Sequence, residues 1–266
     1  MIKTEKITNM NMVLELMRDQ KYDDDIKRYR SSYLYRGLPN SSFHLMTSLQ
    51  RNCKDRQNII EKCILRNFTK YAVIEDSQLI ESIWRQLIIG QHHGLPTRLL
   101  DWTFSPLIGL HFATSGEDLQ DMDKHDAVLW KIDIEEVNSL LPHQYQNILN
   151  KEKAYLFTVD MLIKLVNDLD KYDDDMKNNS FVLLEPPSID QRIINQYSYF
   201  SIIPNSLHDI EGFFDDKTSN TVKYIIGKDL RWEIRDMLDQ MNINERIVYP
   251  GLDGLSEWLK RHYYVK

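Results

Sequence analysis

Hydrophobic and polar positions alternate along the chain with two different periods, which predict a mixture of helices and strands. Apolar residues recur at helical spacing, which gives one apolar face to residues 9–20, 55–74, 78–89, 133–141, 158–169, 230–241 and 252–264. Short runs of apolar, β-branched and aromatic residues predict strands at residues 32–37, 127–132, 181–184, 199–203, 222–226 and 245–249. Because the two kinds of element do not alternate regularly, we expect a single α+β domain. Its central sheet should be mostly antiparallel and flanked by helices.

Three local patterns refine this prediction. Ser105 followed by Pro106 is typical of a helix start, with a side-chain cap and a proline in the first turn. Two acidic runs, at residues 21–25 and 172–175, predict solvated connections. Over residues 55–74, the helical period predicts a buried face made of Ile59, Ile60, Cys63, Ile64, Phe68 and Tyr71.

The composition is that of an ordinary globular protein. Of 266 residues, 42% are hydrophobic and 27% charged, and the net charge of −7 argues against a surface that grips nucleic acid over its whole extent. No apolar run approaches the roughly 20 residues of a membrane span, and the first residues lack the apolar stretch of a secretory signal. We therefore expect a cytoplasmic protein that has no membrane partner and keeps Cys53 and Cys63 as unpaired thiols.

The segment 91–102, Gln-His-His-Gly-Leu-Pro-Thr-Arg-Leu-Leu-Asp-Trp, is the strongest sign of a functional site. Apolar helical patterns flank it on both sides, whereas the segment itself gathers ionisable and polar side chains. A loop held by a rigid scaffold can direct such groups at a ligand. The sequence therefore predicts a site here without specifying a reaction.

The roles of the individual residues in this segment stay open. Adjacent residues such as His92 and His93 cannot form a helical metal pair, so we expect no metal and assign one imidazole to hydrogen bonding or to local packing. Arg98 and Asp101 are three residues apart, and pairing between them would brace the loop. Thr97 offers a hydroxyl at the turn, and Trp102 is expected in the core.

Three residues outside the segment carry candidate chemistry. Arg36 ends an aromatic strand and suits a phosphate or a carboxylate, while the following Gly37 allows close approach of a backbone or a ligand. Glu185 ends another strand, where it is either a solvated terminus or a site residue. Gln196 either hydrogen-bonds a sugar hydroxyl or caps local structure.

These stretches resemble the FRG domain family, named for its (Phe/Tyr)-Arg-Gly motif. The resemblance runs from Tyr33 to Ile203 and rests on three groups in order: Tyr35–Arg36–Gly37 with residues 48–51, then residues 91–103 with 105–107 and 112–113, then residues 185–187 with 192–193 and 196. It divides the chain into an N-terminal helical segment (1–30), an FRG domain (31–205) and an α/β extension (206–266) packed on the same domain. The family implies a bacterial or phage protein with a toxin or phage-defence role.

The order of motifs is also similar to that of ADP-ribosyltransferases, which implies a related fold and NAD as co-substrate. Arg36, Glu185 and Gln196 would then be catalytic, and Arg36, Gly37, His92, Thr97 and Arg98 would bind the nucleotide. Gln196 falls where that superfamily has a glutamate, and an amide cannot supply the negative charge. The activity implied is transfer of ADP-ribose to an unknown protein or nucleic-acid target, or NAD hydrolysis.

Two alternatives remain at this stage. A non-catalytic module would use the same loop to bind a nucleotide, a nucleic acid or a partner protein, and the glutamine at position 196 favours it. A metal-dependent nuclease would need His92, Asp101 and Glu185 to converge on one ion. Convergence of Arg36, the 92–101 loop and Gln196 on one pocket is the observation that decides whether a common site exists.

Overall fold

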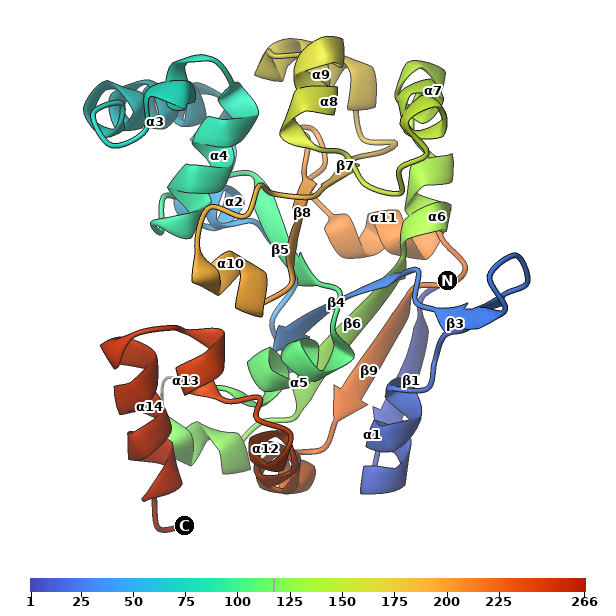
Figure 1. Cartoon of the computed structure of the whole chain (residues 1–266), viewed down its shortest axis with the longest axis vertical. Coiled ribbons are helices and arrows are strands. Elements are labelled where there is room, and N and C mark those ends of the chain that lie inside the picture. The colour runs from blue at the N-terminus through green and yellow to red at the C-terminus, as the bar shows by residue number, and fades with distance from the viewer. Residues whose placement is uncertain (117) are drawn as a thin grey trace.

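A seven-stranded sheet organises the chain (Figure 1), for which a computed structural model describes residues 1–116 and 118–266. The order of strands across the sheet is β1 (Lys3–Ile7), β9 (Val222–Ile226), β6 (Ala127–Asp133), β4 (Tyr33–Leu38), β5 (Leu99–Thr103), β8 (Ser198–Ile202) and β7 (Val182–Leu184). Only the β1–β9 pair is parallel among these neighbours. The predicted α+β class with a mostly antiparallel sheet is confirmed.

Helices cover both faces of the sheet. In chain order they are α1 (Met10–Leu16), α2 (Ser48–Cys53), α3 (Gln57–Ala72), α4 (Ile83–His92), α5 (Pro106–Thr114), α6 (Ile134–Ser139), α7 (His143–Glu152), α8 (Val159–Leu165), α9 (Leu169–Met176), α10 (Gln191–Asn195), α11 (Ile210–Lys217), α12 (Arg231–Gln240), α13 (Glu245–Val248) and α14 (Leu252–His262). Short 3₁₀ turns add η1 (Lys54–Arg56), η2 (Ser77–Ile80), η3 (Leu119–Asp123) and η4 (Lys228–Leu230).

The apolar core is divided in a way that positions the site. On one face a continuous cluster joins strands β4, β5, β6 and β7 to α6 and α11. On the other face there are two clusters: one joins β5, β7 and β8 to α3, α4 and α7–α9, and the other joins β1, β4, β6 and β9 to α1, α5 and α12. The boundary between these two clusters lies between β4 and β5, at the centre of the sheet.

Local sequence rules explain several elements. Asn9 caps α1 by accepting the backbone N–H of Met12, and Ser105 caps α5 in the same way with Pro106 in the first turn. The strands predicted at residues 32–37, 127–132, 181–184, 199–203 and 222–226 are present as β4, β6, β7, β8 and β9.

Four predicted segments have a different structure. The first acidic run belongs to a hairpin formed by β2 (Lys21–Asp23) and β3 (Arg28–Arg30), and the second lies in α9, where Tyr172 is buried. Residues 245–248 form the helical turn α13 rather than a strand, because Glu245 turns toward Arg235 and Arg261. The N-terminal segment is not purely helical, since β1 adds a strand to the main sheet.

The buried face of α3 also differs from the predicted one. Its buried residues are Gln57, Glu61 and Leu65, at the i, i+4, i+8 spacing of a helix, whereas Ile59 and Tyr71 are 68% and 70% exposed. The spacing of hydrophobic residues predicts the wrong face because the polar residue Glu61 is buried in an ion pair with Arg98.

Candidate functional site

The sheet opens between β4 and β5, and a cavity occupies the opening. These two strands share a single residue pair, Tyr35 with Thr103, whereas β4 and β6 share six. A cavity of about 290 Å³ lies there, lined by Tyr35, Arg36, Gly37, Gln91, Asp101, Trp102, Thr103, Phe112, Arg192, Gln196 and Ser198. Three segments distant in sequence thus converge, as the prediction of a common pocket required. We call this space the Arg36 cavity.

Arg36 bridges the opening. Its Nη1 donates a hydrogen bond of 2.7 Å to the backbone oxygen of Asp101 and lies 3.5 Å from the Asp101 carboxylate. Burial lowers the pKa of the guanidinium below its usual value, and the Asp101 charge opposes this shift. Arg36 remains a cation at neutral pH, so the cavity holds a fixed positive charge beside a carboxylate.

Asp101 and Gln91 form the polar wall opposite Arg36. The Asp101 carboxylate is 52% exposed and accepts a hydrogen bond of 3.0 Å from the Gln91 side-chain amide. The Gln91 oxygen in turn accepts a hydrogen bond of 2.6 Å from Thr97, which is fully buried. Thr97 therefore fixes the amide of Gln91 from behind and does not touch the cavity itself.

Gly37 serves helix packing. A Cβ atom built at this position would lie 2.1 Å from the backbone oxygen of Gly109 and 2.3 Å from the backbone nitrogen of Ala113, both in α5. Only glycine lets the helix approach β4 so closely. The predicted close approach is therefore that of a backbone, although Gly37 also borders the cavity.

Arg98 is a bracing residue, and the predicted pairing with Asp101 is wrong. Its guanidinium is 2% exposed and donates to Glu61 of α3, with distances of 2.8 and 2.5 Å, and to Asp173 of α9, at 2.6 Å. These contacts raise the pKa of Arg98, although burial alone would lower it. The arginine locks two helices onto β5 and does not line the Arg36 cavity.

His92 also lies outside the residues that line the Arg36 cavity. Its Nε2 contacts the carboxylate of Asp190, the residue that caps α10. Burial lowers the pKa of the imidazole, with Arg192 and His93 acting in the same direction and Asp190 opposing them. His92 therefore connects the end of α4 to the start of α10.

Gln196 and Arg192 enter the cavity from α10 and its end. The Gln196 side-chain amide donates a hydrogen bond of 3.1 Å to the backbone oxygen of Val248 at the end of α13. The backbone oxygen of Gln196 accepts a hydrogen bond of 2.8 Å from the Thr103 hydroxyl. Arg192 is exposed, and its guanidinium lies 5.2 Å from the centre of the Tyr249 ring. Gln196 thus joins the cavity to the C-terminal segment, while Arg192 adds a second cation.

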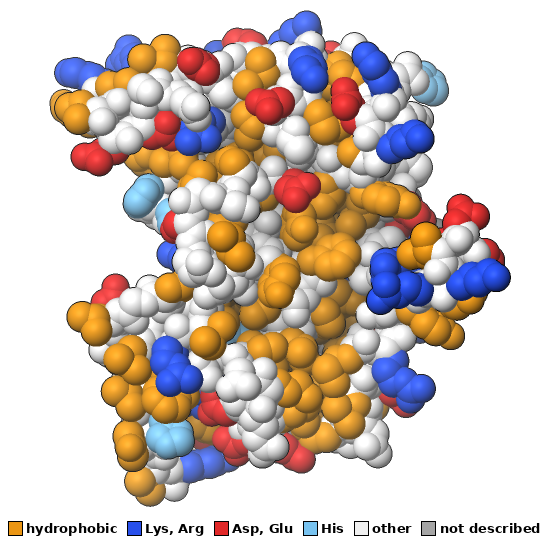
Figure 2. Space-filling view, viewed as in Figure 1, with side chains coloured by type: hydrophobic (Ala, Val, Ile, Leu, Met, Phe, Trp, Pro, Cys, Tyr) orange, Lys and Arg blue, Asp and Glu red, His pale blue; other side chains and the backbone are white. Residues whose placement is uncertain are grey.

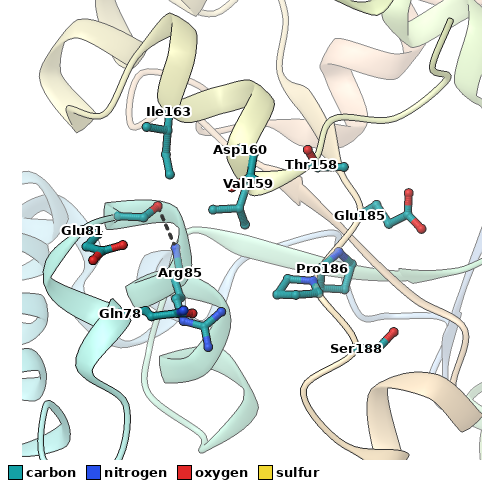
Figure 3. Close-up of a pocket in the computed structure, with 12 residues that line it drawn as sticks. Gln78, Glu81, Arg85, Thr158, Val159, Asp160, Ile163, Glu185, Pro186 and Ser188 are labelled. Carbon is teal, nitrogen blue, oxygen red and sulfur yellow. Dashed lines mark hydrogen bonds between the residues drawn. The ribbon is translucent and has the colours of Figure 1, made fainter. Parts of the chain in front are cut away.

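Glu185 lies in a different cavity (Figure 3). This larger space, of about 590 Å³, is bounded by η2 and α4 on one side, by α8 on another and by residues 185–188. In the close-up, Glu185 and Arg85 are on opposite sides of Pro186. The structure therefore does not bring Glu185 together with Arg36 and Gln196.

The residues expected under the nuclease alternative are also separated. His92 pairs with Asp190, Asp101 lies beside Arg36, and Glu185 lines the other cavity. Within residues 1–116 and 118–266, no three histidine, cysteine or acidic side chains are grouped as metal ligands would be. The arrangement that this alternative needs is not present.

Two polar residues of the site, Gln91 and Arg192, were not singled out as candidates for catalysis or nucleotide binding, and Asp101 was considered only as a partner of Arg98 or as a metal ligand of a nuclease. Gln91 and Asp101 stand at the two ends of the 91–102 segment, and Arg192 follows the double proline of residues 186–187. The signal that could have identified Asp101 is its alternation with buried Leu100 and Trp102 along β5, because a polar residue between buried ones faces the other side of a sheet.

The comparisons with known proteins support one family. Residues 31–122 match the family model of the FRG domain. No curated protein and no solved structure gives a match to the chain. Among the helices that the structure describes, none is long and apolar enough to cross a membrane.

Proposed function

Starting from the FRG domain that this chain contains, we propose that the Arg36 cavity binds the nicotinamide-riboside part of NAD and supports transfer of ADP-ribose from it. The observation that carries the proposal is the convergence of Arg36, Asp101 and Gln196 at the opening of the sheet. Two arginines, one carboxylate, two side-chain amides and several aromatic rings line this space. This combination suits a ligand that carries phosphate, sugar hydroxyls and a planar ring.

Asp101 takes the acidic role in this proposal. In the transfer, the bond between ribose C1′ and the nicotinamide nitrogen breaks, and its electron pair leaves with nicotinamide. A lone pair of the acceptor, water or a side chain of the target, forms the new bond to C1′, and the acceptor loses its proton. Positive charge develops on the ribose during this exchange, and a carboxylate held beside it is stabilising.

The neighbours of Asp101 hold it in place. Gln91 donates to the carboxylate, and Thr97 fixes Gln91 from the buried side. The Arg36 Nη1 is directed mainly at the Asp101 backbone oxygen, at 2.7 Å, and Nε is buried, so Nη2 is the group that would contact a phosphate or a ribose. A preorganised carboxylate does not have to reorient as charge develops.

The acceptor would be a protein or a nucleic acid, or water if the reaction is hydrolysis. As a toxin or phage-defence effector, the protein would inactivate a target or deplete NAD. A purified chain incubated with labelled NAD and a cell lysate distinguishes these cases, because transfer labels macromolecules whereas hydrolysis releases free ADP-ribose.

A second candidate is a module that binds a nucleotide without cleaving it. It is favoured by Gln196, which has no charge and whose amide is tied to Val248. In this case NAD would raise the melting temperature of the protein without release of nicotinamide, because a ligand that binds only the folded state stabilises it.

The deciding experiment measures nicotinamide release from NAD by the purified chain and by three variants. We expect release by the wild type, loss of binding in Arg36→Ala, and a fall of about 100-fold or more in Asp101→Asn. Glu185→Gln is the matched control, because it removes an acid that lies in the other cavity.

The outcomes separate the alternatives. Binding without release in the wild type would support the binding module. Loss of release in Glu185→Gln but not in Asp101→Asn would contradict the assignment of the acid. If NAD neither binds nor reacts, the proposal of a nucleotide site fails.

A further inference from the structure

A second cavity adjoins the Arg36 cavity on the side of the C-terminal helices. Its volume is about 510 Å³, and it lies between the end of α5, η3 and the pair α13–α14. Phe112 lines both cavities. The second one has apolar walls from Phe112, Leu119 and Met122. Its charged groups come from α12, α13 and α14 and are Arg235, Glu245, Glu257, Lys260 and Arg261. We call it the C-terminal cavity.

Tyr249 stands at the junction of the two spaces. Its ring centre lies 6.4 Å from that of Phe112 and 5.2 Å from the guanidinium of Arg192, which lines the Arg36 cavity. Burial raises the pKa of the Tyr249 hydroxyl. The charge of Asp101 also raises this pKa, whereas the charge of Arg235 lowers it. Tyr249 is therefore close to the charges of both cavities.

The size of the Arg36 cavity leaves part of a dinucleotide outside it. Ligand pockets have volumes of roughly 300–1,000 Å³, and about 290 Å³ is at the lower limit. A nicotinamide-riboside group fits such a space, whereas the adenosine and the phosphates need a continuation. Figure 2 shows the surface hollowed between α3–α4 and α13–α14, beside α10, which leaves this side of the molecule open.

We propose that the C-terminal cavity is the subsite for the adenylate half of the dinucleotide, so that residues outside the FRG match complete the ligand site. This inference rests on the proposed binding of the nicotinamide half in the Arg36 cavity. The planar base would lie against Phe112 and Leu119, and the phosphates would pass the Arg192–Tyr249 pair toward Lys260.

Lys260 is the cation most free to serve a phosphate there. Arg261 already donates to Asp239 and Glu245, and Arg235 donates to Glu245. Within residues 1–116 and 118–266, Lys260 has an exposed contact of 3.3 Å with Glu257, and exposed pairs of this kind contribute little. A phosphate can therefore replace that contact without disturbing the buried network.

The test compares NAD with nicotinamide mononucleotide, which lacks the adenylate half. Binding of each probe is measured by calorimetry for the wild type, for Lys260→Glu and for Lys217→Glu. Lys217 is an exposed lysine of α11 that lines neither cavity, so its variant makes the same change of charge elsewhere. We expect the wild type to bind NAD at least about tenfold more tightly than the mononucleotide.

In Lys260→Glu, the affinity for NAD should fall at least about fivefold while that for the mononucleotide stays the same. Equal affinities of the wild type for the two probes, or equal effects of the two lysine variants, would overturn the subsite. If the subsite is overturned in this way but Arg36→Ala abolishes binding of both probes, the proposed function of the Arg36 cavity stands without the adenylate subsite. If neither probe binds the wild type, both proposals fail together.

Discussion

Arg36 and Arg98 both pair with carboxylates, but their surroundings are opposite. Arg98 is 2% exposed, and its guanidinium is shared between Glu61 and Asp173 from two helices. Arg36 is 18% exposed and forms one short hydrogen bond, to a backbone oxygen beside a cavity. One arginine has its hydrogen-bonding capacity used by the fold, and the other keeps much of it for a ligand.

This difference separates structural from functional residues within one motif. Along residues 91–102, Thr97 and Arg98 point into buried contacts, whereas Gln91 and Asp101 reach the Arg36 cavity. Trp102 borders the cavity too, but its indole N–H is used in a buried hydrogen bond to Ser201. The polar residues of the motif therefore have either a structural role or a ligand-binding role. We expect substitutions of the structural residues to reduce stability strongly, and substitutions of the cavity residues to affect mainly the ligand chemistry.

The largest effect is expected for Arg98→Ala. Removing the guanidinium leaves Glu61 buried without its cation, and breaking a buried ion pair in this way costs about 3–5 kcal/mol. Urea unfolding measures the loss. Arg85→Ala is the control, because Arg85 and Asp76 are each 21% exposed, and a pair of this kind contributes about 1 kcal/mol or less. Equal losses in the two variants would contradict the bracing role.

Sequence patterns predicted most of the elements but not this ion pair. Helix α5 and strand β6 follow from local signals, namely a cap with a proline and a short apolar run. The acidic run in α9 resembles an exposed loop because its partner, Arg98, is 75 residues away from Asp173. The burial of Asp173 depends on that distant contact, which the spacing of hydrophobic residues along the chain cannot predict.

The next effect is expected for Gly37→Ala. The added Cβ would meet the backbone of α5 at 2.1 and 2.3 Å, and overpacking of this kind costs typically 1–3 kcal/mol. Gly227→Ala is the matched control, since its nearest neighbour would be 3.8 Å away. Thermal unfolding of both variants tests the point. A Gly37→Ala protein as stable as the control would show that α5 can move away from β4.

A buried base beneath the C-terminal cavity should make stability depend on pH. His111 is fully buried, its Nδ1 is 2.8 Å from the Arg235 guanidinium, and burial together with Arg235 and Arg261 lowers its pKa well below the usual value. The unfolded chain takes up a proton below about pH 6.5, whereas the folded protein does not. Stability is therefore lost as the pH falls through this range.

The size of this loss follows from proton linkage. Between pH 7 and pH 5.5, the free energy of unfolding should fall by about 1 kcal/mol more in the wild type than in His111→Gln. Urea unfolding at the two pH values measures the difference, and carboxylates that titrate in both proteins cancel. Identical pH dependence in the two proteins would mean that the pKa of His111 is the same in the folded and unfolded states.

The candidate site was predictable in part. Arg36 and Gln196 were placed with the central motif, and they do line one cavity with it. Asp101 was assigned to Arg98 because the two are close in sequence, and Glu185 was included because it ends a strand. The opening between β4 and β5 decides which of these side chains meet, and it is a property of strand pairing that no local pattern encodes.

The smallest effect on stability, and the sharpest contrast with Arg98, is expected for Asp101→Asn. The side chain is 52% exposed, and Arg36 keeps its hydrogen bond to the backbone oxygen, so the cost should stay below about 1 kcal/mol. The negative charge beside the proposed ribose is lost at the same time. Nicotinamide release should therefore fall about 100-fold or more while the unfolding midpoint hardly moves. A variant that loses stability as Arg98→Ala does, or that retains full release, would place Asp101 with the bracing residues, and the difference between the two arginines would no longer mark a functional site.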